Sequence, residues 1–157
     1  MAGIYQATRK AQKLFELDTY MGTIRLDQAV HDMAVVDVYL YLKEKLPLSS
    51  DSFTSEKEIR HKEGFITRSH APDFLYEFSD KKGETFCVEV ELSQKAKERL
   101  ESNVKDNYIK YAGQKWFVPA SNKRVRIWLE EFKETYPNIE IIVLEKIMGV
   151  IGNGRSL

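Results

Sequence analysis

The chain has 157 residues, of which 43% are apolar, and this is enough to bury one substantial core. The 24 basic residues balance 24 acidic residues, so the chain lacks the strong basic excess typical of proteins that bind polyanions over their whole surface. No stretch approaches the roughly 18 apolar residues of a membrane span, and the first residues lack the apolar core of a signal peptide. We therefore expect a globular chain with no membrane partner.

The chain has a single cysteine, Cys87, which lies inside an apolar run. One cysteine cannot build a disulfide framework, which favours a protein of a reducing compartment. We expect a cytoplasmic protein in which Cys87 is a small buried hydrophobe rather than a nucleophile.

The first clear element is a long helix. Residues 1–25 give only a weak pattern and are interpreted as an N-terminal remnant with a strand end and a short helix. Apolar residues recur at helical spacing from Leu26 to Leu46, and Pro47 ends the pattern. Residues 53–61, FTSEKEIRH, alternate well enough to predict a strand.

A β-hairpin is predicted in the middle of the chain. Residues 72–78, PDFLYEF, alternate between two faces, and so do residues 85–93, TFCVEVELS. The turn SDKKGE between them contains Gly83, which we expect in the left-handed conformation that such a turn needs.

Helices and strands alternate after the hairpin. Ser93 is a suitable N-cap for a helix over residues 94–112, and Gly113 is expected to close it. Residues 115–120, KWFVPA, predict a short strand.

One more helix and one more strand complete the pattern. Ser121 or Asn122 is expected to cap a helix over residues 123–136. Residues 139–147 are nearly continuous in apolar side chains, which is typical of a strand buried on both faces. The Gly-rich residues 149–157 are expected to form a flexible tail. This order predicts an α/β domain with a mixed central sheet flanked by helices, over residues 26–148.

Three carboxylates are the candidate chemical groups. Glu89 and Glu91 lie two residues apart on one strand face, and Asp73 opens the partner strand. Such oxygen donors suit Mg²⁺ or Mn²⁺, which can activate water and shield a phosphate. Lys95 is expected one turn into the following helix, where its ammonium could stabilise developing charge. Glu56, expected on the strand before the hairpin, could supply a further ligand.

These residues also have simpler interpretations. Acids that alternate along a strand are often solvated, and Glu56 lies in a charged segment where solvent exposure is the default. His31 and Asp32, near the start of the first helix, are interpreted as packing or capping residues.

A basic cluster begins the last helix. Lys123, Arg124 and Arg126 could grip nucleic-acid phosphates together with the N-terminal amides of that helix. Basic groups at that end oppose the helix dipole, and phosphate binding would offset this cost.

The segments APDFLYEF and FCVEVELSQK resemble the signature of PD-(D/E)xK phosphodiesterases. The resemblance implies a restriction-endonuclease-like core, with Asp73 and Glu89 as the two acidic metal ligands. Where the family has Lys two residues after the second acid, this chain has Glu91. Some members of the family use an acid there, and others move the Lys to the neighbouring helix, where Lys95 stands.

The segments VHDMAVVDVYLYL, SEKEIR, HAPDFLYEF, VEVELSQK and YIKYAGQKWFV are similar to the replication-relaxation proteins of plasmids and conjugative elements. That resemblance covers residues 8–118 and implies DNA as a partner, a setting in plasmid mobilisation, and a winged-helix region before the nuclease-like part. The leading hypothesis, which rests on the acidic residues and Lys95, is a nuclease-like domain that acts on DNA by metal-dependent phosphodiester hydrolysis. The rival hypothesis is a non-catalytic module that binds DNA, a relaxase or a replication protein. A homodimer is a third possibility.

Overall fold

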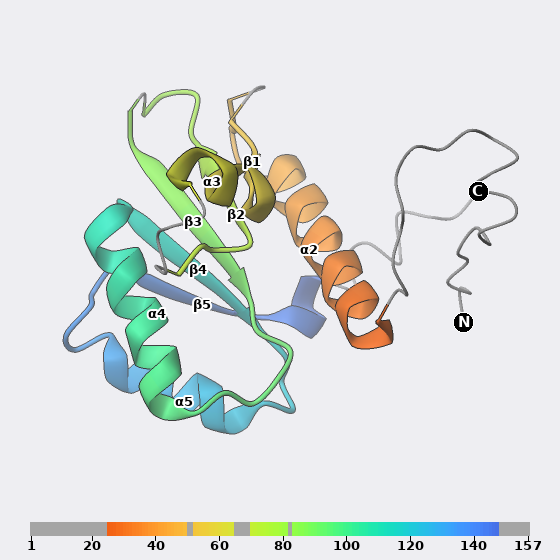
Figure 1. Cartoon of the computed structure of the whole chain (residues 1–157), viewed down its shortest axis with the longest axis vertical. Coiled ribbons are helices and arrows are strands. Elements are labelled where there is room, and N and C mark those ends of the chain that lie inside the picture. The colour runs from red at the N-terminus through yellow and green to blue at the C-terminus, as the bar shows by residue number, and fades with distance from the viewer. Residues whose placement is uncertain (1–24, 50–51, 65–69, 82, 148–157) are drawn as a thin grey trace, which may run out of the picture.

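Figure 1 shows the computed structural model of the chain, which describes residues 25–49, 52–64, 70–81 and 83–147. The expected remnant, apart from its last residue, and the expected tail lie outside these residues. Among the helices described, none is long and apolar enough to cross a membrane. The helices and strands follow in the order α2 (Leu26–Lys45), β1 (Thr54–Ser55), α3 (Glu56–Glu63), β2 (Phe74–Glu77), β3 (Thr85–Val90), α4 (Lys97–Lys110), β4 (Gly113–Val118), α5 (Lys123–Phe132) and β5 (Ile139–Val143).

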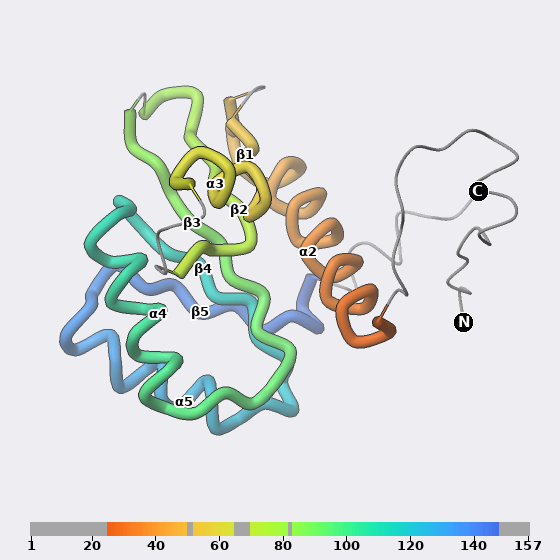
Figure 2. The backbone as a smooth tube through the Cα atoms, in the orientation of Figure 1, coloured from red at the N-terminus to blue at the C-terminus, as the bar shows by residue number. Residues whose placement is uncertain are grey.

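The strands form one mixed sheet with the order β1-β2-β3-β4-β5. The first three strands are antiparallel, whereas β3, β4 and β5 run parallel. Parallel neighbours need a crossover, and the chain makes these crossovers through α4 and α5, as the trace in Figure 2 shows. The prediction of an α/β chain with a mixed sheet flanked by helices is therefore confirmed.

Helices cover both faces of the sheet. On one face α2 packs its buried residues Ala34, Val38 and Leu42 against side chains of β2, β3 and β4. On the other face α4 and α5 enclose a second core around Trp116 of β4. Because successive strand residues point to opposite faces, β4 contributes Phe117 to the first core and Trp116 and Val118 to the second.

The long helix and the hairpin agree with the sequence prediction. Helix α2 ends at Lys45, just before Pro47, because a residue preceding proline is disfavoured in helical conformation. In the hairpin Phe74 pairs with Val88 and Glu77 pairs with Thr85. Gly83 in the turn has a φ of 86°, as expected for its left-handed conformation.

The strand predicted over residues 53–61 is wrong. Only Thr54 and Ser55 are extended, and Glu56 is the first residue of helix α3. Ser55 caps this helix: its side chain accepts from the backbone N–H of Glu58, while the Glu58 carboxylate accepts from the backbone N–H of Ser55. This reciprocal capping starts the helix. Ile59 is its one buried residue, and its other side chains are polar or charged.

The predicted boundaries of the next helix are also wrong. Helix α4 starts at Lys97 rather than at residue 94, and Ser93 does not cap it, because the Ser93 side chain and backbone N–H bond to Glu91. Gly113 begins β4 instead of closing the helix. A Cβ atom at Gly113 would lie 2.7 Å from the Phe86 ring, so glycine is required there by close packing.

The last two elements are shorter than expected. Asn122 is at the N-cap position of α5, but its side chain donates to the carbonyl of Ser93 instead of capping the helix. Helix α5 ends at Phe132, and β5 ends at Val143. Strand β5 is only partly buried and its Glu140 is exposed, so the prediction of a strand buried on both faces is wrong.

Candidate functional site

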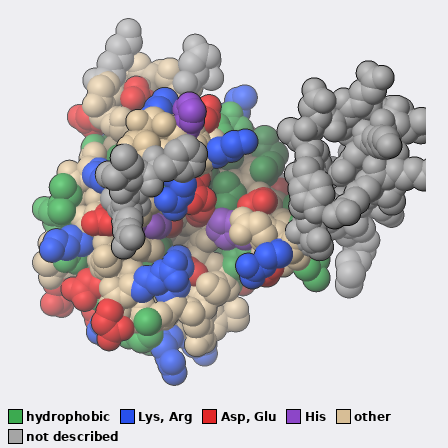
Figure 3. All heavy atoms as spheres, in the orientation of Figure 1, with side chains coloured by type: hydrophobic (Ala, Val, Ile, Leu, Met, Phe, Trp, Pro, Cys, Tyr) green, Lys and Arg blue, Asp and Glu red, His purple; other side chains and the backbone are tan. Residues whose placement is uncertain are grey.

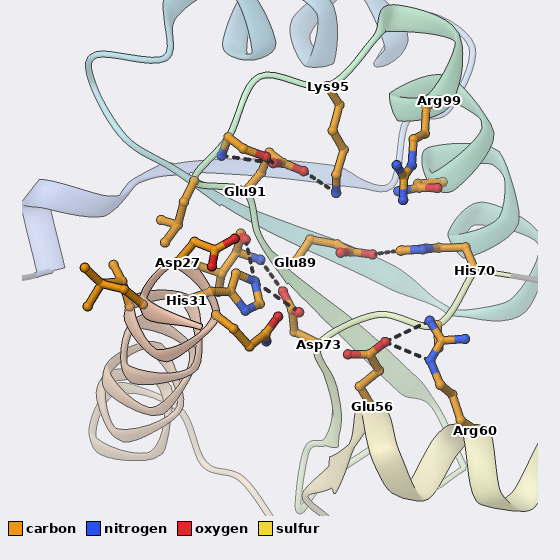
Figure 4. A pocket seen from close by; sticks show the side chains of 18 residues that line it. Asp27, His31, Glu56, Arg60, His70, Asp73, Glu89, Glu91, Lys95 and Arg99 are labelled. Carbon is orange, nitrogen blue, oxygen red and sulfur yellow. Dashed lines mark hydrogen bonds and ion pairs between the residues drawn. The ribbon is translucent and has the colours of Figure 1, made fainter. Parts of the chain in front are cut away.

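A cavity of about 780 Å³ opens where the ends of α2 and β3 meet the loop before α4. Acidic, basic and histidine side chains gather on this face of the molecule (Figure 3). The close view in Figure 4 shows that these side chains come from α2, α3, β3 and α4 and from the loops before β2 and α4. All five residues predicted to be catalytic line this cavity, namely Glu56, Asp73, Glu89, Glu91 and Lys95.

Asp73 is held at the start of β2 by its backbone and by its side chain. Its carbonyl accepts from the backbone N–H of Glu56, which brings the start of α3 to the cavity. Its Oδ2 atom accepts a 2.6 Å hydrogen bond from the backbone N–H of Val90. The Asp73 carboxylate is thereby fixed beside the end of β3.

His31 reaches the same carboxylate from α2. Its Nε2–H donates to the carbonyl of Val90 at 3.1 Å and lies 3.4 Å from Oδ1 of Asp73. The hydrogen bond and negative charge of Asp73 raise the pKa of His31 to about 9, against the opposing effect of burial. His31 therefore carries a positive charge at neutral pH and offsets the charge of Asp73.

Glu89 is buried in the middle of the cavity floor, with 4% of its surface exposed. Its Oε1 atom accepts a 2.8 Å hydrogen bond from the Asn107 side chain and another from Nε2 of His70. Burial raises the pKa of Glu89, the negative charge of Asp73 raises it further, and His70 opposes both effects. The effect of the Asp73 charge on Glu89 indicates that the two carboxylates lie close together in the same cavity.

Glu91 follows the end of β3 and is also buried. Its Oε1 atom accepts from the backbone N–H and the hydroxyl of Ser93, at 3.2 and 2.9 Å. Its Oε2 atom forms an ion pair with the ammonium of Lys95. Lys95 lies in the loop before α4, so the expectation that it stands one turn into the helix is wrong. The loop nevertheless directs its ammonium into the cavity, as Figure 4 shows.

Glu56 is engaged by a cation at the opposite rim. Arg60 lies one helical turn later in α3, and its Nε and Nη2 atoms each lie 2.8 Å from Oε1 of Glu56. Glu56 thus lies on a helix and not on the predicted strand, but the first position of that helix still faces the cavity.

Only two of the acidic residues are suited to bind a magnesium ion. Within the described ranges, no group of three or more His, Cys, Asp or Glu side chains is arranged to hold a metal. Mg²⁺ is commonly bound through one or two carboxylates and several waters, and carboxylate oxygen is the donor it prefers. Asp73 and Glu89 fit that mode, whereas Glu91 is committed to Lys95.

The basic cluster predicted to contact nucleic acid lies elsewhere. Lys123, Arg124 and Arg126 are in the first turn of α5, and none of them lines the main cavity. Arg124 lies over the ring of Trp128, and Arg126 donates to the carbonyl of Ala120. The structure therefore does not join this cluster to the acidic residues.

Sequence reasoning missed several residues of the site, namely His31 as a partner of Asp73, and His70, Asn107, Arg60 and Arg99 as cavity or hydrogen-bonding residues. Of these residues, Arg60 could have been found from the sequence, because its spacing from Glu56 is the i,i+4 spacing of helical ion pairs. The others meet the site only through tertiary contacts.

Four buried or half-buried carboxylates, two histidines and three longer cations thus surround one cavity. Comparisons of the chain with protein-family models, with curated proteins and with solved structures found no match.

Proposed function

We propose that this chain is a nuclease-like domain that hydrolyses phosphodiester bonds of DNA with the help of Mg²⁺ or Mn²⁺. Its setting would be that of the replication-relaxation proteins of plasmids and mobile elements, in the cytoplasm. The observation that carries the proposal is the convergence of Asp73, Glu89, Glu91 and Lys95 on one cavity.

The order of the elements supports a PD-(D/E)xK core. Apart from α3, a helix, three strands, a helix and a strand follow one another from α2 to β4, which is the core order of the PD-(D/E)xK family that the sequence resembles. Helix α3 is an addition to that order, between β1 and β2. The two acids that match the signature lie on the two arms of the hairpin: Asp73 immediately precedes β2, and Glu89 belongs to β3.

Each residue of the cavity has a distinct role in this proposal. Asp73 and Glu89 would hold the cation, which when bound polarises the phosphate and activates a water molecule. His31 orients Asp73 by bonding both to it and to the Val90 carbonyl. The Lys95 ammonium, positioned by Glu91, would neutralise charge on the phosphate.

A cleavage assay on single-stranded DNA and on supercoiled DNA, in Mg²⁺ or Mn²⁺, tests the proposal. Asp73→Asn and Glu89→Gln are expected to lower the rate by at least about a hundredfold, because each removes a negative charge that the cation needs. Glu101→Gln is the matched control, since Glu101 is an exposed acid of α4 outside the cavity. Equal rates in the parent and the two cavity variants would refute hydrolysis at this site.

A second candidate function is a non-catalytic module that binds DNA, a relaxase or a replication protein. It is favoured by the fact that each carboxylate already has a protein partner: His31 for Asp73, His70 for Glu89 and Lys95 for Glu91. A binding module needs no metal. Calorimetric titration with Mn²⁺ separates the two functions, because only the enzyme should give a saturable heat that Asp73→Asn abolishes.

A further inference from the structure

Two walls of different chemistry face each other across the cavity. On the α2 side, Leu26, Val30 and Leu92 line it, and we call these residues the apolar shelf. Leu26 is 69% exposed and Val30 is 49% exposed, so both offer hydrocarbon surface to a ligand. On the other side lie Arg60, Lys95 and Arg99, which we call the cationic wall (Figure 4).

The cationic wall contains one group that is available to a ligand. Lys95 and Arg60 are paired with Glu91 and Glu56. Arg99 lines the cavity and, within the part of the chain that the structure describes, makes no hydrogen bond or ion pair. An unpaired guanidinium beside a cavity binds the non-bridging oxygens of a phosphate well, because its donors match two oxygens at once.

The acidic floor lies between the two walls. Its charge would repel a phosphate, but His31 and Lys95 compensate Asp73 and Glu91. The cavity therefore has an anion-binding side and an apolar side, and the buried acidic residues lie between them. A nucleotide has the matching form, with a charged phosphate at one end and an apolar base face at the other.

We infer that the cavity accepts an unpaired nucleotide, so that the substrate class is single-stranded nucleic acid or an unpaired end rather than intact duplex. In a duplex the base faces are stacked inside, and a protein reaches only the base edges, the sugars and the phosphates. A base can lie on the apolar shelf only if it is unstacked, as in other proteins that bind single strands. This inference rests on the proposed function, because it names the substrate of the same site.

Fluorescence anisotropy in EDTA tests the inference without metal or cleavage. The full chain is titrated into a short labelled single strand, the same sequence as duplex, and a single strand in which abasic sites replace the central nucleotides. The single strand should bind at least about fivefold more tightly than either of the others, because they hide or lack the bases. Equal affinity for all three would overturn the inference.

Matched variants locate the effect. Val30→Ser should weaken binding of the intact single strand about fivefold and leave the abasic strand unchanged. Val36→Ser is the control, because Val36 is on the same helix with a similar exposure of 55% but does not line the cavity. Arg99→Gln should weaken both strands, since it removes a phosphate contact. Equal effects of the Val30 and Val36 substitutions would overturn the apolar shelf.

The binding and nicking experiments fail separately. A chain that binds single strands through Val30 and Arg99 but does not nick DNA loses the proposed hydrolysis and keeps this inference. A chain that nicks DNA but binds duplex as tightly as single strand keeps the proposed function and loses this inference.

Discussion

His31 and Asp73 are joined across the end of the sheet, with Nε2 of His31 3.4 Å from Oδ1 of Asp73 and 3.1 Å from the carbonyl of Val90. The contact ties α2 to the hairpin that carries the acidic residues. It also charges the imidazole, because the pKa of His31 is raised to about 9. His31, which the sequence pattern predicts to be a packing or capping residue, thus contributes to the electrostatics of the cavity.

The raised pKa of His31 predicts that stability falls at alkaline pH. The folded pKa of about 9 lies above the ordinary value of 6.5, so the folded chain binds the proton more tightly than the unfolded chain. The stabilisation is complete below pH 6.5 and is lost as the pH rises through about 9. Urea unfolding at several pH values should show a loss of roughly 1 to 3 kcal/mol across this window.

The His31→Gln variant provides the control for this pH dependence. Glutamine can still donate to the Val90 carbonyl but does not titrate, so the slope between pH 6.5 and 9 should largely disappear. A variant with the same slope as the parent would show that other groups cause it.

Glu89→Gln is predicted to separate stability from function. Burial is the largest influence on the pKa of Glu89 and raises it, so the ionised carboxylate costs free energy in the folded state. Glutamine keeps an oxygen that can accept from Asn107 and carries no charge. We expect the variant to unfold at the same or a higher urea concentration at pH 8. Its free energy of unfolding should rise by at most about 1 kcal/mol. A clear loss of stability would mean that the hydrogen bond between His70 and the Glu89 carboxylate outweighs the cost of burial.

Regular alternation made the hairpin predictable. In residues 72–78 and 85–93 every second side chain is apolar, and the register follows from this pattern once the turn at Gly83 is fixed. The faces of Asp73 and Glu89 could therefore be assigned from the sequence. Their buried partners could not be assigned, because Asn107 comes from α4 and its contact with Glu89 depends on how that helix packs.

The strand predicted after Ser55 is wrong, although the sequence contains a signal for a helix there. Its alternation suggested a strand, yet Ser55 and Glu58 have the spacing of a capping box, which begins a helix. The start of α4 lacked such a signal. Ser93 has a side chain suited to capping, but the buried carboxylate of Glu91 accepts from both its hydroxyl and its N–H, and only the folded chain reveals this competition.

Lys95 and Glu91 are predicted to be coupled in stability. Lys95→Met removes the ammonium that pairs with a buried carboxylate and should destabilise the chain by roughly 1 to 3 kcal/mol at pH 7. Glu91→Gln in the same chain should recover much of that loss, because the remaining side chain is neutral. Urea unfolding of the two single variants and the double variant measures the coupling, and strictly additive effects would contradict it.

Gly113 is predicted to be required by packing rather than by backbone conformation. The Phe86 ring would lie 2.7 Å from a Cβ atom at this position, and Gly113 belongs to a strand and not to a left-handed helix end. Gly113→Ala should therefore cost roughly 1 to 3 kcal/mol, as overpacking does. Gly113→Asn should cost more, because its side chain is larger.

At a left-handed C-cap the order would be reversed, since asparagine tolerates that conformation better than alanine. Thermal unfolding of the two variants distinguishes the cases, and the double variant Gly113→Ala/Phe86→Leu should recover stability only if the ring is the obstacle.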